Sequence, residues 1–308
     1  MISLEAGAVT PLAGRWDFRA GDDLGWAEPG LPEVGWGEVS VPGPLGRQGY
    51  PDLSFGWYRV QLELPPETAE GLPESETRQI RETRWAIRLG DVSSAYELYV
   101  GGELVGGGGS LLPEAVPDPN HHRIFAVPAS AFGVDGRALV ALRIWRSPTA
   151  PRIAGGVHFG PLEAGPLDQL RDRAYRSLLP DLLVAAILAF MALFVLFGSL
   201  AREHMRGFFW LSPALAAAAL SVFLRSQGRF LTDLDPGLLL HGWMVAACLI
   251  PVFGMQFLWR ILERDLHWVE RIYQGTHGLA AVAVAVVPIP LALQIFAGWQ
   301  LWLGVLVG

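Results

Sequence analysis

The sequence predicts a multi-domain membrane protein, in which an all-β sandwich is followed by an α-helical transmembrane bundle. The first observation is charge: residues 178–308 hold seven acidic and seven basic residues, so the whole net charge of −7 falls on residues 1–177. The second is patterning, because apolar residues alternate with period two in the first half and form long uncharged runs in the second. We therefore expect a sandwich over residues 1–165, a linker over 166–177 and a bundle over 178–308.

Alternating polar and apolar residues mark the strands of the first domain. The clearest runs are Tyr58–Leu64, Trp85–Leu89, Tyr96–Val100 and Val140–Ile144, with shorter apolar pieces at Val39–Val41 and Ile124–Val127. Gly101-Gly102 follows the third run and suits a tight hairpin turn that needs positive φ. Residues 65–84 are charged and lack periodicity, so we expect a long exposed loop there. Many short strands separated by Gly and Pro are typical of an antiparallel sandwich.

The second half predicts membrane-spanning helices. A helix needs about 20 apolar residues to cross a hydrocarbon layer of ~30 Å. Runs of this kind predict four complete spans and the start of a fifth, at about 178–200, 207–227, 237–259, 272–294 and 298–308. Short connections between them indicate antiparallel neighbours. Because no charged residues close the fifth segment, we expect the bundle to continue beyond Gly308.

Loop charges alone do not orient the bundle. Arginines are enriched in cytoplasmic loops, and the loops after the first and third spans carry five of them. The opposite side carries Arg229, the span-end Arg225 and three arginines just before the first span. The two sides are nearly balanced, so the charge rule leaves the topology open.

Composition excludes several classes of function. An acidic first half lacks the clustered basic charge that nucleic-acid binding requires. The chain contains no lysine, which removes the P-loop and Schiff-base chemistry. The single cysteine, Cys248, lies in an apolar run and can form neither an internal disulfide nor a paired-cysteine metal site. We find no catalytic motif and expect no catalytic residue, metal or cofactor within these residues.

Several motifs of the first half carry a family resemblance. They are Trp16-Asp17-Phe18, Gly56-Trp57-Tyr58-Arg59, Leu89-Gly90-Asp91-Val92, Tyr96-Glu97-Leu98-Tyr99-Val100 and Ala141-Leu142-Arg143-Ile144. Their order and spacing resemble the galactose-binding-like jelly roll that forms the N-terminal domain of many β-galactosidase-type glycoside hydrolases. The chain departs from that pattern at Gly101-Gly102, where Asn-Gly is usual, and in its long segment 65–84. The resemblance implies that the catalytic carboxylates belong to a separate barrel domain, which this chain lacks.

A jelly roll followed by membrane spans also resembles the bacterial seven-transmembrane receptors with diverse intracellular signalling modules. That resemblance implies a multi-pass protein of the bacterial inner membrane whose N-terminal domain is extracytoplasmic. It further implies a sensory function, in which a small molecule, for example a carbohydrate, binds the jelly roll and the helices signal to an output domain beyond Gly308. The alternative is a jelly roll that docks a protein or has a structural role on a membrane anchor.

A ligand site on the sandwich is expected in the loops at one of its ends. Aromatic faces and hydrogen-bonding side chains hold sugars, and these loops supply such residues. The candidates are Tyr50, Trp57, His121, Arg123 and Arg152, with His122 and His158 nearby. Trp57 opens a strand and fits a place in the core better than a ligand contact. The partners that we expect are membrane lipid and a carbohydrate or other small molecule; a homo-oligomer remains open.

Overall fold

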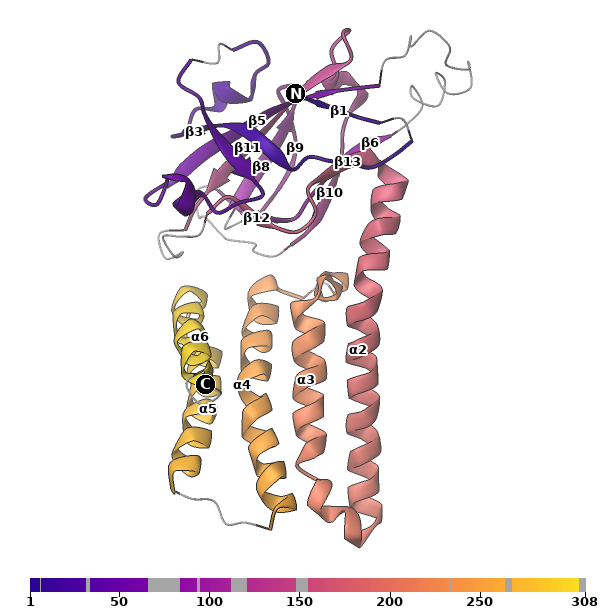
Figure 1. Ribbon diagram of the computed structural model, residues 1–308, viewed down its shortest axis with the longest axis vertical. Helices are drawn as coiled ribbons and strands as arrows, with labels where there is room; N and C mark the ends of the chain where they lie inside the picture. The colour runs from indigo at the N-terminus through magenta and orange to yellow at the C-terminus, as the bar shows by residue number, and fades with distance from the viewer. Residues whose placement is uncertain are drawn as a thin grey trace. The chain divides into compact units, whose positions relative to one another are not determined.

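A computed structural model describes most of the chain (Figure 1). The described residues are 1–5, 7–31, 34–65, 84–92, 95–111, 121–147, 155–232, 234–263 and 268–304. The predicted loop over residues 65–84 therefore lies almost entirely outside the described residues. The chain divides into two compact units, Met1–Tyr175 and Arg176–Gly308, and each is described by itself below.

The first unit contains a large antiparallel sheet. Its strands lie in the order β4 (Gly37–Val41), β3 (Gly14–Ala20), β5 (Phe55–Glu63), β11 (Arg137–Trp145), β8 (Ala95–Val100) and β9 (Glu103–Gly108), and β1 (Ile2–Ser3) pairs with β5 in parallel. The long central strands β5 and β11 pair over their whole lengths, from Phe55 opposite Trp145 to Glu63 opposite Arg137. The predicted hairpin at Gly101-Gly102 is confirmed, because both glycines have positive φ and join β8 to β9.

A second sheet faces the first. It consists of β10 (Arg123–Ala126), β6 (Trp85–Leu89), β13 (Glu163–Pro166) and β2 (Thr10–Pro11), and a separate pair is formed by β7 (Asp91–Val92) and β12 (Val157–Phe159). Short 3-10 turns, η1 (Leu24–Ala27), η2 (Leu45–Gln48) and η3 (Ala129–Ala131), interrupt the connections. The predicted β-sandwich is thus confirmed. Alternation missed β3, which has seven residues, and the short strands β1, β2, β7, β12 and β13, which have two to four residues each.

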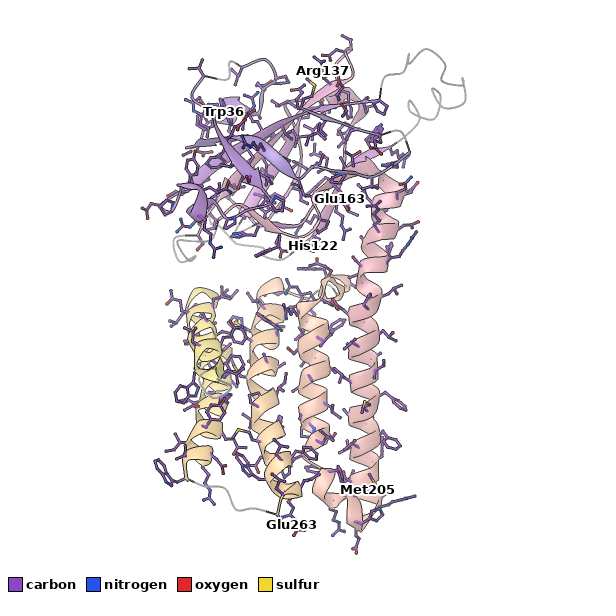
Figure 2. All side chains as sticks on the ribbon, viewed as in Figure 1. Trp36, His122, Arg137, Glu163, Met205 and Glu263 are labelled. Atoms are coloured by element: carbon purple, nitrogen blue, oxygen red, sulfur yellow. The ribbon has the colours of Figure 1, made fainter. Side chains whose placement is uncertain are left out.

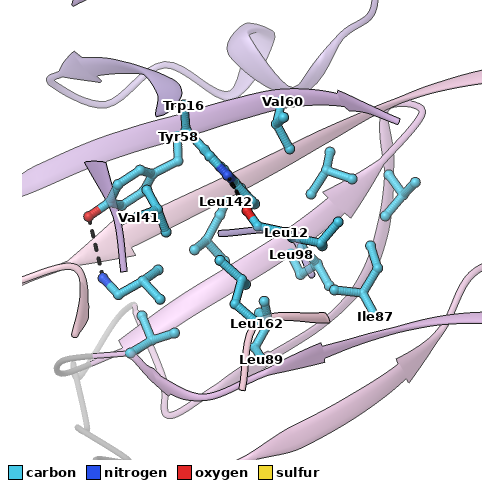
Figure 3. Close-up of a cluster of buried hydrophobic side chains, with 14 of the residues drawn as sticks. Leu12, Trp16, Val41, Tyr58, Val60, Ile87, Leu89, Leu98, Leu142 and Leu162 are labelled. Carbon is cyan, nitrogen blue, oxygen red and sulfur yellow. Dashed lines mark hydrogen bonds between the residues drawn. The ribbon is translucent and has the colours of Figure 1, made fainter. Parts of the chain in front are cut away.

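The core lies between the two sheets (Figure 3). Alternate residues of the large sheet, such as Tyr58, Leu98 and Leu142, meet Ile87 and Leu89 of β6, and all of these side chains are fully buried. Two hydrogen bonds satisfy polar atoms inside this layer: Trp16 Nε1 donates to the Leu12 carbonyl oxygen over 2.8 Å, and the Val157 N–H donates to the Tyr58 hydroxyl over 3.3 Å. Burial also raises the pKa of the Tyr58 hydroxyl.

The opposite face of the large sheet carries an outer aromatic layer, which we define as Trp26, Trp36, Trp57 and Tyr99. Trp57 is fully buried there, since the Trp26 ring lies 6.4 Å and the Tyr99 ring 5.5 Å from its own ring. Guanidinium groups cover the two remaining tryptophans, Arg19 at 4.4 Å from Trp26 and Arg59 at 4.9 Å from Trp36. The chain between β3 and β4 therefore shields a face that would otherwise be open to water.

Strand β9 brings backbone against side chains of its neighbours. Gly106, Gly107 and Gly108 of this strand pair with β8. A Cβ atom added at Gly106 would lie less than 3.0 Å from the Phe125 ring, and one at Gly108 would be as close to the Tyr96 ring. The absence of side chains lets this strand approach both rings closely.

Helices follow the sandwich. They are α2 (Leu167–Ala201), α3 (Leu211–Arg225), α4 (Pro236–Ile261), α5 (Trp268–Val286) and α6 (Ile289–Gly304). The 3-10 turn η4 (Glu203–Phe208) lies between α2 and α3, and η5 (Gln227–Leu231) lies between α3 and α4. The stretch 166–177 was expected to be a linker, but Pro166 ends β13 and residues 167–177 form the first part of α2. The last two expected spans, 272–294 and 298–308, have the wrong boundary. The break comes at Pro288, inside the first of them, and α6 already begins at Ile289, because the residue before a proline disfavours the helical conformation.

In the second unit α3 packs on α4, α4 on α5 and α5 on α6. The core between the last three helices is formed by Leu240, Met244, Cys248, Val284 and Phe296 among others. Two of the described helices, α2 and α4, are long and apolar enough to cross a membrane, whereas Leu211–Arg225 and Leu291–Leu303 are apolar but shorter. Length and composition alone support this statement, and a buried helix of another kind of protein can meet the same criteria.

Candidate ligand-binding site

A pocket of about 380 Å³ opens on the first unit between β10 and the start of α2. Its lining combines basic and aromatic side chains and consists of His121, His122, Arg123, Ile124, Phe125, Arg171, Ala174 and Tyr175. No acidic residue belongs to the described residues that line it. The volume falls in the range of small-molecule sites, which are typically about 300–1,000 Å³.

The start of α2 packs against the sandwich, and this packing holds one wall of the pocket in place. Leu167 and Leu170 are buried against Val9, Ala86 and Ile124. Polar contacts add to this packing, because Gln169 Nε2 donates to the Gly7 carbonyl oxygen over 2.6 Å and Arg173 pairs with Glu163 over 3.3 Å. Arg171 and Tyr175 are four residues apart and so lie on one face of the helix.

Strand β10 supplies the other wall. The Arg123 guanidinium donates to the Gly107 carbonyl oxygen over 3.0 Å and to His121 Nδ1 over 3.2 Å. His122 Nε2 lies 3.1 Å from Asp91 Oδ1 on β7, an ion pair when the imidazole is protonated. Figure 2 labels His122 on the sandwich. These contacts hold the basic side chains in place without a ligand, which reduces the entropy that binding would cost.

A second histidine, His158, also lies near Asp91. His158 on β12 accepts a hydrogen bond from the Gly155 N–H at Nε2 over 2.8 Å, so that nitrogen carries no proton. Burial lowers the pKa of His158, and the negative charge of Asp91 partly opposes this shift. His158 is therefore a neutral structural residue of the loop and does not line the pocket.

The structure places the five predicted ligand residues in different surroundings. His121 and Arg123 line the pocket. Tyr50 instead packs edge-on against Phe18 at 4.6 Å, beside the core. The prediction that Trp57 contacts a ligand is wrong, because its ring is fully buried in the outer aromatic layer and is not exposed at the surface. Arg152 lies outside the described residues.

The sequence interpretation missed Arg171 and Tyr175. They lie in the stretch taken for a linker, where no ligand loop was sought. Their spacing of four residues next to an apolar pair at Leu167 and Leu170 was the signal that could have revealed a helix docked on the sandwich. Among the described residues, no group of three or more His, Cys, Asp or Glu side chains is arranged to hold a metal ion.

Comparison with known proteins gives a structural likeness only. No protein-family model and no curated protein sequence matches the chain. Solved structures that resemble it include the β-glucuronidase of Bacteroides uniformis, with 18% identity and a TM-score of 0.38 over 51% of this chain and 17% of that one. The Bifidobacterium dentium enzyme, complexed with coumarin-3-O-glucuronide, gives 22% identity and a TM-score of 0.33 over 45% of this chain and 20% of its own.

These neighbours correct one prediction. The chain spans about a fifth of each enzyme's length, and the enzymes are glycoside hydrolases. The expected structural resemblance to glycoside hydrolases is confirmed, since both enzymes belong to that class. The predicted sensory receptor is wrong on this comparison, because the similar structures are carbohydrate-processing enzymes and not signalling proteins.

Proposed function

We propose that the chain is a membrane-anchored carbohydrate-binding protein whose sandwich holds an acidic sugar in the pocket between β10 and α2. The observation that carries this proposal is the convergence of Arg123 and Arg171 on a pocket without a carboxylate among its described lining. A guanidinium group can hold a sugar carboxylate through two parallel hydrogen bonds, which are about twice as strong as neutral ones. Neutral sugars lack this interaction.

The remaining lining suits the hydroxylated body of a sugar. Tyr175 is 63% exposed, so the face of its ring is free to cover a sugar ring. His121 and His122 add polar ring atoms to the same lining. The pocket would thus recognise charge through the arginines and ring shape through the tyrosine.

The membrane anchor is supported by the outer surface of α2. Leu183, Phe190 and Phe197 are each more than 60% exposed, although they are large and apolar. These residues are seven apart, so they recur on every second turn along one side of the helix. An exposed apolar surface of this extent marks contact with lipid or with protein, and α2 has the length to cross a bilayer. The extracytoplasmic position of the sandwich stays a prediction from the sequence.

Ligand binding is tested by thermal shift of the full chain in detergent. Glucuronate and galacturonate should raise the melting temperature, and glucose and galactose should do so much less. Arg171→Gln should weaken binding of the acidic sugars several-fold, because Arg171 is exposed and its loss leaves the fold intact. Arg15→Gln, a change to an arginine that is 78% exposed elsewhere on the sandwich, is the matched control.

Two results would count against this function. An equal response to neutral and acidic sugars would remove the role of the arginines, and no response to any sugar would remove the site. The anchor has its own test, since alkaline carbonate washing of cell membranes should leave the chain in the pellet. Release into the supernatant would show that the helices do not cross the bilayer.

A further inference from the structure

The second unit has a larger pocket, of about 1,080 Å³, at the end where α2, α4 and α5 meet η4. All of its lining belongs to this unit: Ser199, Leu200, His204, Arg206, Gly207, Phe209, Trp210, Gln256, Trp259, Arg260, Glu263 and Arg271. Figure 2 shows Met205 and Glu263 at this same end of the helices. The sugar pocket proposed above shares none of these residues.

Positive charge dominates this pocket. Arg206, Arg260 and Arg271 contribute three guanidinium groups, and Glu263 is the single carboxylate of the described lining. Arg206 also pairs with Glu203 over 3.4 Å, but both side chains of that pair are largely exposed. Exposed pairs contribute little energy, so Arg206 stays available to an anion. The pocket therefore favours a ligand with at least one negative charge.

The pocket walls are held by contacts between helices. Gln256 on α4 donates to the Gln274 side-chain oxygen over 3.0 Å, and Gln274 on α5 donates to the Val252 carbonyl oxygen over 2.9 Å. The Trp210 ring stacks on Phe253 of α4 at 6.2 Å. These contacts bring Arg260 of α4 and Arg271 of α5 to the same pocket.

Aromatic side chains surround the arginines. Trp210 is 37% and Trp268 66% exposed, and Trp259 lines the pocket itself. Tryptophan is enriched where a bilayer meets water, because its ring is apolar and its N–H is polar. This end of the unit thus has the composition of a membrane–water interface, with a basic pocket open at that level.

We propose that this pocket binds the phosphate headgroup of an anionic phospholipid. Basic pockets between membrane helices bind acidic headgroups in this way, and arginine holds phosphate through parallel hydrogen bonds. A lipid fits better than a soluble anion, because exposed apolar side chains such as Leu200, Leu258 and Leu262 lie beside the arginines and can contact acyl chains. The inference rests on the membrane insertion proposed above.

The test is native mass spectrometry of the full chain in detergent, with phosphatidylglycerol and phosphatidylcholine added in equal amounts. Phosphatidylglycerol should be retained roughly tenfold over phosphatidylcholine, a difference of about 1.4 kcal/mol, because only its headgroup carries a net negative charge for the arginines to attract. The triple variant Arg206→Gln, Arg260→Gln and Arg271→Gln should lose this preference. Arg225→Gln should keep it, because Arg225 lies at the other end of α3.

The outcomes separate the two proposals. If both lipids are retained equally, or the triple variant behaves as the parent does, headgroup binding is wrong while membrane insertion stands. If no phospholipid is retained at all, headgroup binding is wrong as well, and membrane insertion is decided by the carbonate wash described above. Displacement of phosphatidylglycerol by millimolar inorganic phosphate would overturn the lipid as ligand and assign the pocket to a soluble phosphate.

Discussion

The two units treat apolar side chains in opposite ways. In the sandwich the large apolar residues of the central strands, such as Leu98 and Leu142, are fully buried. On α2 residues of the same kind, such as Leu183 and Phe190, are more than 60% exposed. The membrane anchor proposed above accounts for this difference, because water expels apolar surface at about 25 cal/mol per Å² whereas lipid does not.

The sandwich also buries charged side chains. The sandwich encloses Arg59, Arg88 and Arg143, each less than 10% exposed, and surrounds them with partners. Arg143 forms two ion pairs, with Asp22 at 2.6 Å and with Glu97 at 2.9 Å, and these contacts raise the pKa of its guanidinium group. Burial, followed by the hydrogen bond to Glu97, raises the pKa of Tyr99 to about 12, so its hydroxyl keeps its proton and donates a hydrogen bond to Glu97 Oε2.

The largest expected effect comes from the same substitution made in both units. Leu142→Ala should destabilise the sandwich by about 3 kcal/mol, because it removes a packed side chain and leaves a cavity. Leu183→Ala should change stability by less than about 0.5 kcal/mol, as is usual for a side chain without packed neighbours. Amide exchange of β11 and α2 in the full chain measures both. Equal losses would mean that α2 is packed against protein rather than lipid.

A smaller effect is expected from the buried ion pairs. Arg143→Gln should destabilise the sandwich by about 2 kcal/mol, since two partly buried carboxylates lose their charged partner. Arg15→Gln should have nearly no effect, because Arg15 and Glu38 are both more than half exposed. Urea unfolding followed by β11 exchange compares the two variants. A loss at Arg143 no larger than that at Arg15 would contradict the structural role of the network.

The smallest effect concerns pH. The pKa of His158 is lowered in the folded chain, whereas the unfolded chain takes up its proton near the usual value of about 6.5. Below that pH the unfolded state binds the extra proton, so the stability of the sandwich should fall as pH drops through and below 6.5. His158→Gln keeps an acceptor for the Gly155 N–H and should flatten this dependence. A parallel pH profile in the variant and parent would exclude His158 as its source.

The sequence predicted the sandwich better than its site. Alternation identified β5, β6, β8 and β11, because each packs one face against the core, and every second residue of such a strand must therefore be apolar. The two-residue strands β1, β2 and β7 carry no such period, since they are fixed by pairing with distant segments. Partners 60 residues apart, such as Ile2 and Leu62, leave no local signal.

Ligand residues were harder to predict because aromatic residues serve two purposes. Trp57 looked suitable for a sugar, but the segment containing Trp26 folds over it, and that contact depends on a connection outside the strand. Arg171 and Tyr175 were missed for the converse reason. Their role depends on α2 docking at Leu170, which only the folded sandwich reveals.

The glycines of β9 have a consequence for variation among related sequences. Gly106 and Gly108 are neither catalytic nor placed at a strained turn, yet any side chain there would collide with Phe125 or Tyr96. Purifying selection should therefore preserve these codons as strictly as those of a binding site. If every invariant position were taken for a catalytic or binding residue, this strand would be mistaken for a functional site. A larger residue at Gly106 or Gly108 should be accepted only in sequences where the facing aromatic residue is also replaced by a smaller one.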